Sequence, residues 1–574
     1  MANPGSASVR KIFDWNWWHI ALRALVLSAM LGPDGHGVLA DSAAGPAVVG
    51  AGHNDHQMNF LVVVVDDLGY SDIGAFGGAD IETPVLDRLA NDGVKLASFY
   101  TAPTCSPTRA ALLTGTDPHI AGLGNMAELL VENQRNKPGY EGYLNERVVT
   151  VATLLRDAGY FTAMTGKWHL GLERNQGPAA HGFTRSFVLL DGGAAHFDDT
   201  GLMAATPVAQ YREGLDPANW PRGGYSSDVY TDRMIQYLRE NGGSKPFFAY
   251  LAFTAPHWPL QAPDELIRKY HGRYDEGWDV LRDQRLAGLR RAGLASQSAR
   301  STPPPGYRPW NALKESERRI EAKKMEIYAA MVDDVDRNIG RLLEELSRTG
   351  ELRNTMILVM SDNGAEGTPL ERSPLFSDWI KRFDNSLENM GRAGSYVFYG
   401  PNWAYAATAP GKYYKSHTSE GGIHTPALMW RADLASRGTT ARAIVTVMDI
   451  APTLLELAGV THPSFYQGRA VAPLRGRSLA AFFENATAHI HSADTAFGTE
   501  LFGRRALREG DWKILLEPPP FGSNQWQLYD LTQDPGETQN LAEKHPNLVE
   551  RLAGRWSRWA KEVGVVLPEG QSGY

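Results

Sequence analysis

Four short apolar runs, each followed at once by polar side chains, constrain the fold of this 574-residue chain more than any other feature. The runs occupy residues 60–65, 159–166, 246–253 and 355–362. Their length and their β-branched and aromatic residues are typical of strands buried on both faces. Helical patterns alternate with them at residues 83–93, 149–159 and 326–350. This alternation predicts an α/β fold in which helices flank a large mixed, mostly parallel sheet.

The polar side chains behind the four runs predict a single site. In open α/β sheets, ligands bind beyond the carboxyl ends of the strands. We therefore expect side chains that are far apart in the sequence to meet at one edge of the sheet. The polar residues at the four ends are Asp66, Asp67, Lys167, His169, His257, Asp362 and Asn363.

The acidic members of this group are typical of a metal site. Asp66, Asp67, Asp362 and Asn363 offer only oxygen donors, and hard oxygen donors select Ca²⁺ or Mg²⁺ over zinc or copper. The alternative is structural: the two aspartates cap a helix, and residues 362–364 form a turn. The occurrence of both pairs at strand ends favours a metal.

The basic members suit an anion. Arg109, Lys167, His169 and His257 beside a divalent cation would bind a tetrahedral oxyanion such as sulfate or phosphate. The alternative for each histidine is a hydrogen-bonded residue of the interior. For His257, the rigid stretch APHWP argues against an ordinary core position.

Cys105 is the one cysteine of the chain, which excludes an intramolecular disulfide and a cysteine-rich zinc site. The stretch CSPTRAALLTG predicts a loop that enters a helix, with Pro107 in the first turn. A cysteine at a helix N-terminus is expected to have a lowered thiol pKa. The alternative is a buried cysteine that acts as a small apolar filler.

The N-terminal residues 1–40 predict a leader. Arg10 and Lys11 precede an apolar run at residues 24–32, and Val38 and Ala40 are placed like the small residues before a signal-peptidase cut. This pattern favours a signal peptide and export to the periplasm or outside the cell; a disordered leader of a cytoplasmic protein is the alternative. The run is too short to span a bilayer. A net charge of −8 without a basic stripe argues against nucleic acid as a partner.

Two motifs carry a resemblance to a known family. The stretch PTCSPTRAALLTG at residues 103–115 resembles the first signature of the type I sulfatases, and GYFTAMTGKWH at residues 159–169 resembles the second. The chain is similar to bacterial arylsulfatases from about residue 59 almost to its end. The resemblance implies an alkaline-phosphatase-like fold. The core Cys-x-Pro-x-Arg is shared with phosphonate monoester hydrolases of the same superfamily.

The resemblance also implies a prosthetic group and a metal. In the family, a separate formylglycine-generating enzyme oxidises the motif cysteine, here Cys105, to formylglycine, whose hydrate offers two geminal hydroxyls. Ca²⁺ then touches the hydrate and the sulfate. The residues implied to hold Ca²⁺ are Asp66, Asp67, Asp362 and Asn363.

Further site residues follow from the same resemblance. One hydroxyl attacks sulfur while Asp362 accepts its proton, and Arg109 and Lys167 stabilise the developing charge. His257 protonates the leaving oxygen of the alcohol or phenol. Lys415 binds sulfate. His169 takes a proton from the second hydroxyl, which regenerates the aldehyde and expels sulfate.

One departure from the family pattern concerns the segment near Lys415. The family commonly has Glu-Gly-Gly-x-Arg-x-Pro there, whereas this chain has EGGIHTP with His424 in the arginine place. We expect that position to brace the loop rather than to touch substrate. Lys412 is close enough in sequence to be a rival for the role of Lys415.

The sequence predicts two folded regions after the leader. Residues 59–465 form the catalytic domain, and residues 466–574 form a smaller α+β domain with antiparallel strands and a final helix at residues 546–563. Insertions at residues 196–245 and 367–411 are expected to be loops and short helices. The aromatic-rich stretch 395–410 is predicted to be either an aryl-binding wall or surface packing.

Three functions fit these patterns. The first is a calcium-dependent sulfatase that acts on small-molecule aryl or alkyl sulfate esters. The second is a phosphonate or phosphate ester hydrolase with the same nucleophile. The third is an inactive relative that only binds, which the full set of site residues disfavours.

Overall fold

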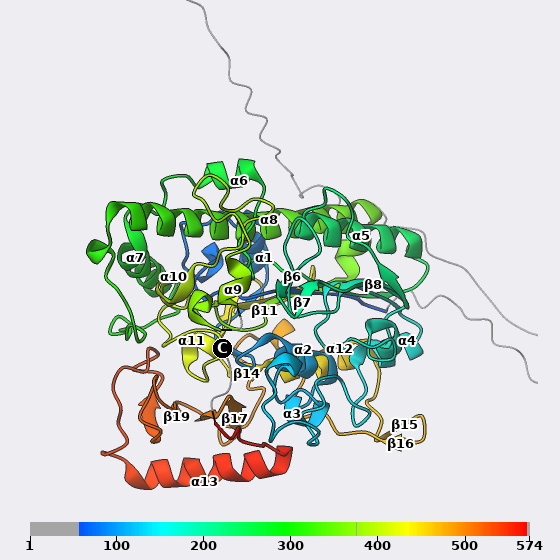
Figure 1. Ribbon diagram of the computed structural model, residues 1–574. Coiled ribbons are helices and arrows are strands. Elements are labelled where there is room, and N and C mark those ends of the chain that lie inside the picture. The colour runs from blue at the N-terminus through cyan, green and yellow to red at the C-terminus, as the bar shows by residue number, and fades with distance from the viewer. Residues whose placement is uncertain (1–56, 375, 571–574) are drawn as a thin grey trace, which may run out of the picture. The chain divides into compact units, whose positions relative to one another are not determined.

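The computed structural model of the protein describes residues 57–374 and 376–570, and a ten-stranded mixed sheet forms its centre (Figure 1). In spatial order the strands are β13 (Thr439–Ala441), β2 (Val94–Leu96), β12 (Ala427–Trp430), β11 (Thr355–Ser361), β1 (Asn59–Val65), β10 (Phe247–Ala252), β4 (Phe161–Lys167), β5 (Arg185–Leu189), β8 (Tyr211–Glu213) and β9 (Asp216–Ala218). The five strands from β11 to β5 are parallel to one another. The predicted leader at residues 1–40 lies outside the described residues, so export stays a prediction.

Strand β1 shows why the sheet needs helices on both faces. Leu61, Val63 and Val65 pack into one apolar core, whereas the alternate residues Phe60 and Val62 pack into another. Successive side chains of a strand point to opposite faces of the sheet. A fully apolar strand therefore needs other elements packed on both faces. The uninterrupted apolar run at residues 60–65 is therefore typical of a central strand.

Helices from separate parts of the sequence cover the two faces. On the side of Leu61 lie α1 (Pro84–Asp92), α5 (Ser226–Asn241), α6 (Asp264–Lys269), α7 (Gly277–Arg291), α8 (Glu315–Thr349) and α10 (Gly400–Ala407). On the side of Phe60 lie α2 (Cys105–Thr114), α3 (Pro118–Ala121), α4 (Val151–Asp157) and α12 (Ile450–Ala458). The prediction of an alkaline-phosphatase-like α/β fold is confirmed.

Two predictions about the local structure are wrong. Helix α8 begins at Glu315 rather than at residue 326, because its first turns are polar and lack the apolar repeat that marked the rest. The insertion at residues 196–245 contains more than loops and short helices. It holds α5, β8, β9 and a hairpin of β6 (Thr200–Met203) and β7 (Thr206–Val208). Strands of three or four residues are too short to show an alternating pattern.

The C-terminal region has a sheet of its own. Its four antiparallel strands lie in the order β17 (Ala496–Leu501), β18 (Arg504–Glu509), β19 (Trp512–Leu516) and β20 (Gln527–Asp530). Helix α13 (Pro546–Val563) buries Leu552 and Trp556 against Leu507 and Ile514 of this sheet. A smaller C-terminal α+β region is thus confirmed, whereas the boundary at residues 465 and 466 stays a prediction.

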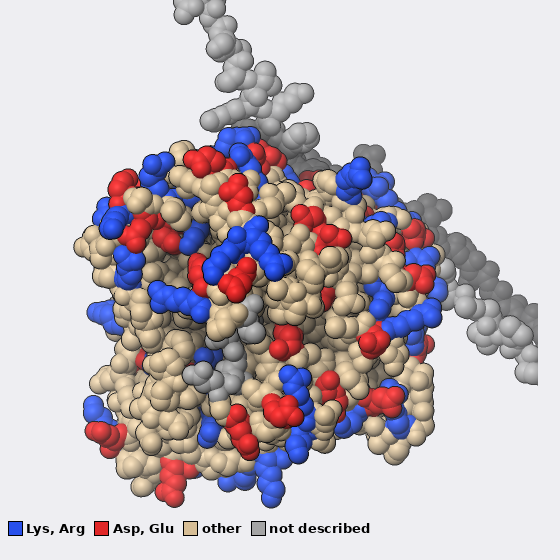
Figure 2. Space-filling model, viewed as in Figure 1, with Lys and Arg blue, Asp and Glu red and all other residues tan. Residues whose placement is uncertain are grey.

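The remaining elements are short. They are β3 (Phe99–Tyr100) with β14 (Val445–Thr446), β15 (Phe465–Tyr466) with β16 (Arg469–Ala470), α9 (Ser377–Ile380) and α11 (Glu420–Ile423). Within the described residues, no helix combines the length and the apolarity that crossing a membrane requires. Acidic and basic side chains are interspersed over the face seen in Figure 2.

Candidate active site

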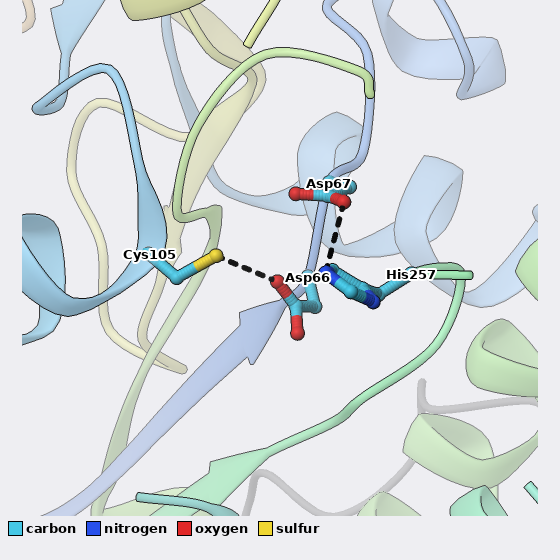
Figure 3. Close-up of side chains that lie close together, drawn as sticks. All are labelled: Asp66, Asp67, Cys105 and His257. Carbon is cyan, nitrogen blue, oxygen red and sulfur yellow. Dashed lines mark hydrogen bonds and ion pairs between the residues drawn. The ribbon is translucent and has the colours of Figure 1, made fainter. Parts of the chain in front are cut away.

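The carboxyl end of β1 delivers two buried aspartates to the centre of the site. Asp66 and Asp67 follow the last residue of β1, and Asp67 has a left-handed backbone with a φ of 66°. Cys105 approaches from the start of α2, and His257 from the loop after β10 (Figure 3). One donor atom from each of these four residues lies within 4.8 Å of the others. The end of β1 and the start of α2 therefore lie side by side at this site.

Helix α2 places the cysteine. Thr104 has an extended backbone, the helix begins at Cys105, and Gly115 ends it in the left-handed conformation that glycine tolerates best. The Cys105 Sγ lies 3.4 Å from the Asp66 Oδ1. Burial raises the pKa of the thiol well above its usual range, so the expected lowering by the helix N-terminus is wrong. Desolvation of a charge outweighs the helix dipole here.

Two buried cations hold Asp66. Lys167, the last residue of β4, donates from Nζ to Asp66 Oδ2 at 2.7 Å, and an Arg109 nitrogen lies 3.8 Å from the same oxygen. Burial opposes ionisation of Asp66, but these two cations outweigh it and lower its pKa. Arg109 also donates to the backbone oxygen of Lys167 at 2.9 Å. Strand β10 lies between β1 and β4, so the long Lys167 side chain reaches past one strand to Asp66.

Asp362 and Asn363 join the cluster because β11 is the parallel neighbour of β1. Ser361 is in register with Val65, so the residues that follow both strands lie side by side. Asp362 accepts from Arg109 Nε and Nη2 at 3.0 and 2.7 Å and from the Asp67 N–H at 3.2 Å. Asn363 donates from Nδ2 to Asp67 Oδ1 at 2.6 Å.

Lys415 reaches the same cluster from a distant loop. Its Nζ lies 2.9 Å from Asp67 Oδ1 and 3.5 Å from Glu366 Oε2. The rival Lys412 instead donates to the Tyr529 hydroxyl at 3.3 Å. Of the two lysines, the structure brings Lys415 into the predicted site.

Backbone contacts fix the loop of Lys415 against the turn that follows β11. The N–H of Gly364 donates to the oxygen of Gly422 at 2.9 Å, and the N–H of Lys415 donates to the oxygen of Ala365 at 3.0 Å. A Cβ atom at position 364 would lie 1.8 Å from the oxygen of Gly421, so only glycine fits there. The two segments approach each other backbone to backbone.

The donor set fits a hard divalent cation. Asp66, Asp67 and Asp362 supply carboxylate oxygens, and the Oδ1 of Asn363 is buried without a hydrogen-bond partner among the described residues. Burial, opposed by Lys415 and assisted by neighbouring carboxylates, raises the pKa of Asp67 to about 8. A bound cation would remove this cost of ionising Asp67 and would use the unpaired amide oxygen.

His257 is a buried, neutral imidazole. Its Nδ1 contacts the Trp258 oxygen at 2.6 Å, and its Nε2 lies 3.7 Å from Asp67 Oδ2. Burial, reinforced by Lys415 and Lys167, lowers the pKa of His257 well below its usual range. The ring therefore needs a bound anion nearby before it holds a second proton.

His169 lies at the same edge of the sheet, two residues beyond β4. Its Nε2 lies 3.1 Å from Oε1 of Glu128, which belongs to the short 3₁₀ helix η2 (Ala127–Leu129). Neither Glu128 nor Glu366 is among the residues predicted from the sequence. No spacing marks Glu128, because its segment contains no strand end and no motif. Glu366 carried a signal, since it follows Asn363 by three residues in the same turn.

His424, which replaces the usual family arginine, lies outside the cluster. Its Nε2 contacts the oxygen of Ala97 at 2.8 Å, and its ring lies against those of Tyr70 and Tyr100. These contacts tie the loop after α11 to the region of β3. They agree with a bracing role.

The aromatic stretch at residues 395–410 is not surface packing, because its rings are buried, and its role as an aryl-binding wall stays a prediction. Trp403 is fully buried and meets Trp278 and Trp310 in the core. Tyr396, in contrast, packs against Trp258, the residue next to His257. The stretch contributes to the core and to the surroundings of the site.

The site gathers oxygen donors and buried cations around Cys105 at the carboxyl ends of parallel strands, an arrangement that suits a hydrolase of oxyanion esters. The sulfatase family model matches residues 58–460, and a model of the C-terminal region of N-sulphoglucosamine sulphohydrolase matches residues 410–560. The chain belongs to the sulfatase family, whose members hydrolyse sulfate esters, and this family implies formylglycine and a divalent metal.

Three relatives illustrate the similarity. An uncharacterised sulfatase of Schizosaccharomyces pombe is 46% identical over 88% of this chain and 94% of its own length. An arylsulfatase of Klebsiella aerogenes is 38% identical over 77% of this chain and 95% of its own length. The crystal structure of Ps i-CgsB superposes with a TM-score of 0.63 at 24% identity and covers 88% of this chain and 93% of that one, which shows the shared fold.

Proposed function

We propose that this sulfatase hydrolyses aryl sulfate esters with a formylglycine made from Cys105 and with a bound Ca²⁺. A formylglycine-generating enzyme would act on the motif around Cys105 before the enzyme is active. The observation that carries the proposal is the position of Cys105. Its sulfur lies beside Asp66, within a buried cluster of oxygen donors that three cationic side chains surround.

Asp66, Asp67, Asp362 and Asn363 are the residues that would hold the calcium ion. When bound, Ca²⁺ supplies a Lewis acid that polarises a sulfate oxygen and fixes its orientation. A formylglycine hydrate at position 105 supplies an oxygen nucleophile and a second hydroxyl for releasing sulfate. The oxygen-only donor set and the unpaired Asn363 Oδ1 support this assignment.

The cations of the chain would bind and orient the sulfate group. Arg109, Lys167 and Lys415 are fully buried, so their attraction for an anion is little screened by water. Each already pairs with a carboxylate of the cluster, which fixes the position of its nitrogen atoms. Their geometry is therefore set before substrate arrives, as electrostatic stabilisation of a transition state requires.

His257 would hold the proton for the leaving oxygen at Nε2. The ring is neutral in the protein alone, because burial and two lysines disfavour its charged form. The negative charge of a bound sulfate ester acts in the opposite direction and favours the imidazolium. Nδ1 stays occupied by the Trp258 oxygen, so Nε2 is the atom that exchanges the proton.

Two observations support an aryl group as the leaving side. The Klebsiella aerogenes relative, which this chain matches over 95% of that protein's length, is an arylsulfatase. In addition, His257 stacks on Trp258, with ring centroids 4.8 Å apart, and Trp258 continues into an apolar cluster with Phe376 and Tyr396. An aromatic leaving group next to His257 would meet apolar rings.

The test is to produce the protein together with a formylglycine-generating enzyme and to measure turnover of matched aryl sulfate and aryl phosphonate substrates. We expect mass spectrometry of the peptide containing Cys105 to show an aldehyde in place of the thiol. We expect aryl sulfate to be the better substrate and C105A to be inactive. Full activity with an unmodified thiol would refute the formylglycine, and preference for the phosphonate would refute the sulfatase assignment.

A further inference from the structure

The environment of His169 differs from that of an ordinary buried histidine. Its Nε2 lies 3.1 Å from Glu128 Oε1 and 3.4 Å from Oε2, so one carboxylate faces one ring nitrogen. The other nitrogen, Nδ1, is buried and has no hydrogen-bond partner among the described residues. His169 lies near the cluster, because a Cβ atom at Gly192 would meet its ring and one at the adjacent Gly193 would meet the ring of His257. Buried polar atoms are nearly always paired, so an unpaired nitrogen at this place indicates an atom reserved for a ligand.

The backbone holds the ring in this place. His169 has a φ of 57°, a left-handed conformation that is costly for a residue with a side chain. A Cβ atom at Gly192 would lie 2.9 Å from both Cε1 and Nε2 of His169, so the ring lies directly over this glycine. Gly192 and the Glu128 carboxylate thus both meet the Cε1–Nε2 edge of the imidazole.

Glu128 is the carboxylate that interacts with the ring. Burial disfavours its charged form, but the charge and hydrogen bond of His169 prevail and hold the pKa of Glu128 at about 2. Its side chain keeps 34% of its surface exposed, so water screens part of this attraction. The other nearby acid, Asp191, accepts from the backbone N–H of Gln210 at 2.6 Å instead.

We propose that Glu128 is the positioning residue of His169: its carboxylate accepts the Nε2–H and so leaves Nδ1 as the unprotonated, proton-accepting atom. This inference rests on the proposed function, in which His169 takes a proton from the second hydroxyl at position 105. A neutral imidazole carries a proton on only one of its two nitrogens, and a carboxylate facing Nε2 favours the tautomer with the proton on Nε2. The same negative charge stabilises the imidazolium once Nδ1 has accepted a proton.

The proton and the electrons balance in this step. The hydroxyl proton moves to Nδ1, the O–H electron pair forms the carbonyl, and the C–O bond to sulfate breaks with its electrons leaving on sulfate. The imidazolium then releases its proton to water. Glu128 touches neither the substrate nor residue 105 in this scheme, and it acts only through the ring of His169.

The first experiment requires neither formylglycine nor metal. In protein with unmodified Cys105 and ¹⁵N-labelled histidine rings, long-range ¹H–¹⁵N correlation reports which ring nitrogen carries the proton, and H169N assigns the signal. For the neutral ring we expect one tautomer with the proton on Nε2. E128A should give a mixture of tautomers. E128Q, which keeps the size of the side chain, should also give a mixture, because an amide can accept from or donate to Nε2.

The matched control is E132A, which removes a 97% exposed carboxylate a few residues further along the chain. It should leave the His169 signal unchanged. A single Nε2-protonated tautomer that persists in folded E128A and E128Q would overturn the proposal. So would a wild-type ring with its proton on Nδ1.

The second experiment separates two steps of turnover in the matured enzyme. With an aryl sulfate, E128A should slow sulfate release by at least about tenfold, the usual effect of losing a partner that orients a reactive group. The rate of phenol release in the first turnover should change little, because phenol leaves before His169 accepts the proton that allows sulfate release. Equal slowing of both products would overturn the positioning role. No turnover in the wild type would refute the proposed function instead, and the tautomer measurement would still decide the role of Glu128.

Discussion

His119 makes the stability of the protein depend on pH. It lies on α3, and its Nδ1 is 2.9 Å from Asp117 Oδ1 while its Nε2 is 3.6 Å from Oε2 of Glu500 in the C-terminal sheet. Burial opposes a charge on this ring, but the two carboxylates prevail and raise the pKa of His119 to about 9. The protonated ring therefore joins α3 to β17.

The magnitude follows from the difference between the folded and unfolded pKa values. An unfolded histidine titrates near 6.5, and 1.36 kcal/mol per pKa unit converts the difference to about 3 kcal/mol. The contact with Glu500 is long for a hydrogen bond, so we expect protonated His119 to contribute about 2 to 3 kcal/mol to the free energy of unfolding. Because the folded pKa is raised, the contribution is complete below about pH 6.5. It is lost as the pH rises toward 9.

The assay is urea unfolding of wild type and H119Q at pH 6 and at pH 10. Between pH 6 and pH 10, the free energy of unfolding of the wild type should fall by about 2 to 3 kcal/mol more than that of H119Q, since other pH effects cancel in the comparison. H271Q is the matched control, because His271 is 82% exposed and also faces a carboxylate. The reasoning would be refuted if the free energy of unfolding had the same pH dependence in wild type and H119Q. It would also be refuted if the stability of the wild type relative to H119Q increased with pH.

Two further predictions concern the site itself. A chelator should abolish turnover and Ca²⁺ should restore it, because without a metal Asp67 is costly to ionise and the Asn363 Oδ1 has no partner among the described residues. Activity that survives complete metal removal, or that returns only with zinc, would contradict the calcium site. H257A should impair alkyl sulfates up to about 10²-fold more than sulfates of acidic phenols, since poor leaving groups need the acid most. An unchanged dependence of kcat/KM on leaving-group pKa across a series of phenols would show that His257 only packs or binds sulfate.

The sequence predicts the meeting of distant residues wherever strand order settles it. Asp66 and Asp362 are almost three hundred positions apart, yet each follows a fully apolar run, and parallel neighbours place such residues side by side. The family signatures added Cys105, whose position at the start of a helix was also readable from Pro107 and the apolar residues after it. The α/β fold and the shared edge could therefore be predicted.

Properties that depend on surroundings could not be predicted in the same way. The thiol pKa of Cys105 was predicted to fall, because the helix N-terminus is visible in the sequence and the burial that outweighs it is not. Glu128 was missed because only tertiary structure brings it to His169. The start of α8 was misplaced because its first turns have no apolar repeat. For the thiol and for Glu128, the deciding surroundings come from other parts of the chain.

The close approach of Gly364 to Gly421 and Gly422 has a consequence for engineering. The segment that carries Asp362 and Asn363 and the segment that carries Lys415 are joined through main-chain atoms, with no side chain between them to absorb a change of length. An exchange of one segment with a homologue would shift the lysine relative to the metal ligands. Residues 362–366 and 411–424 are therefore best transplanted as one unit, or both left in place.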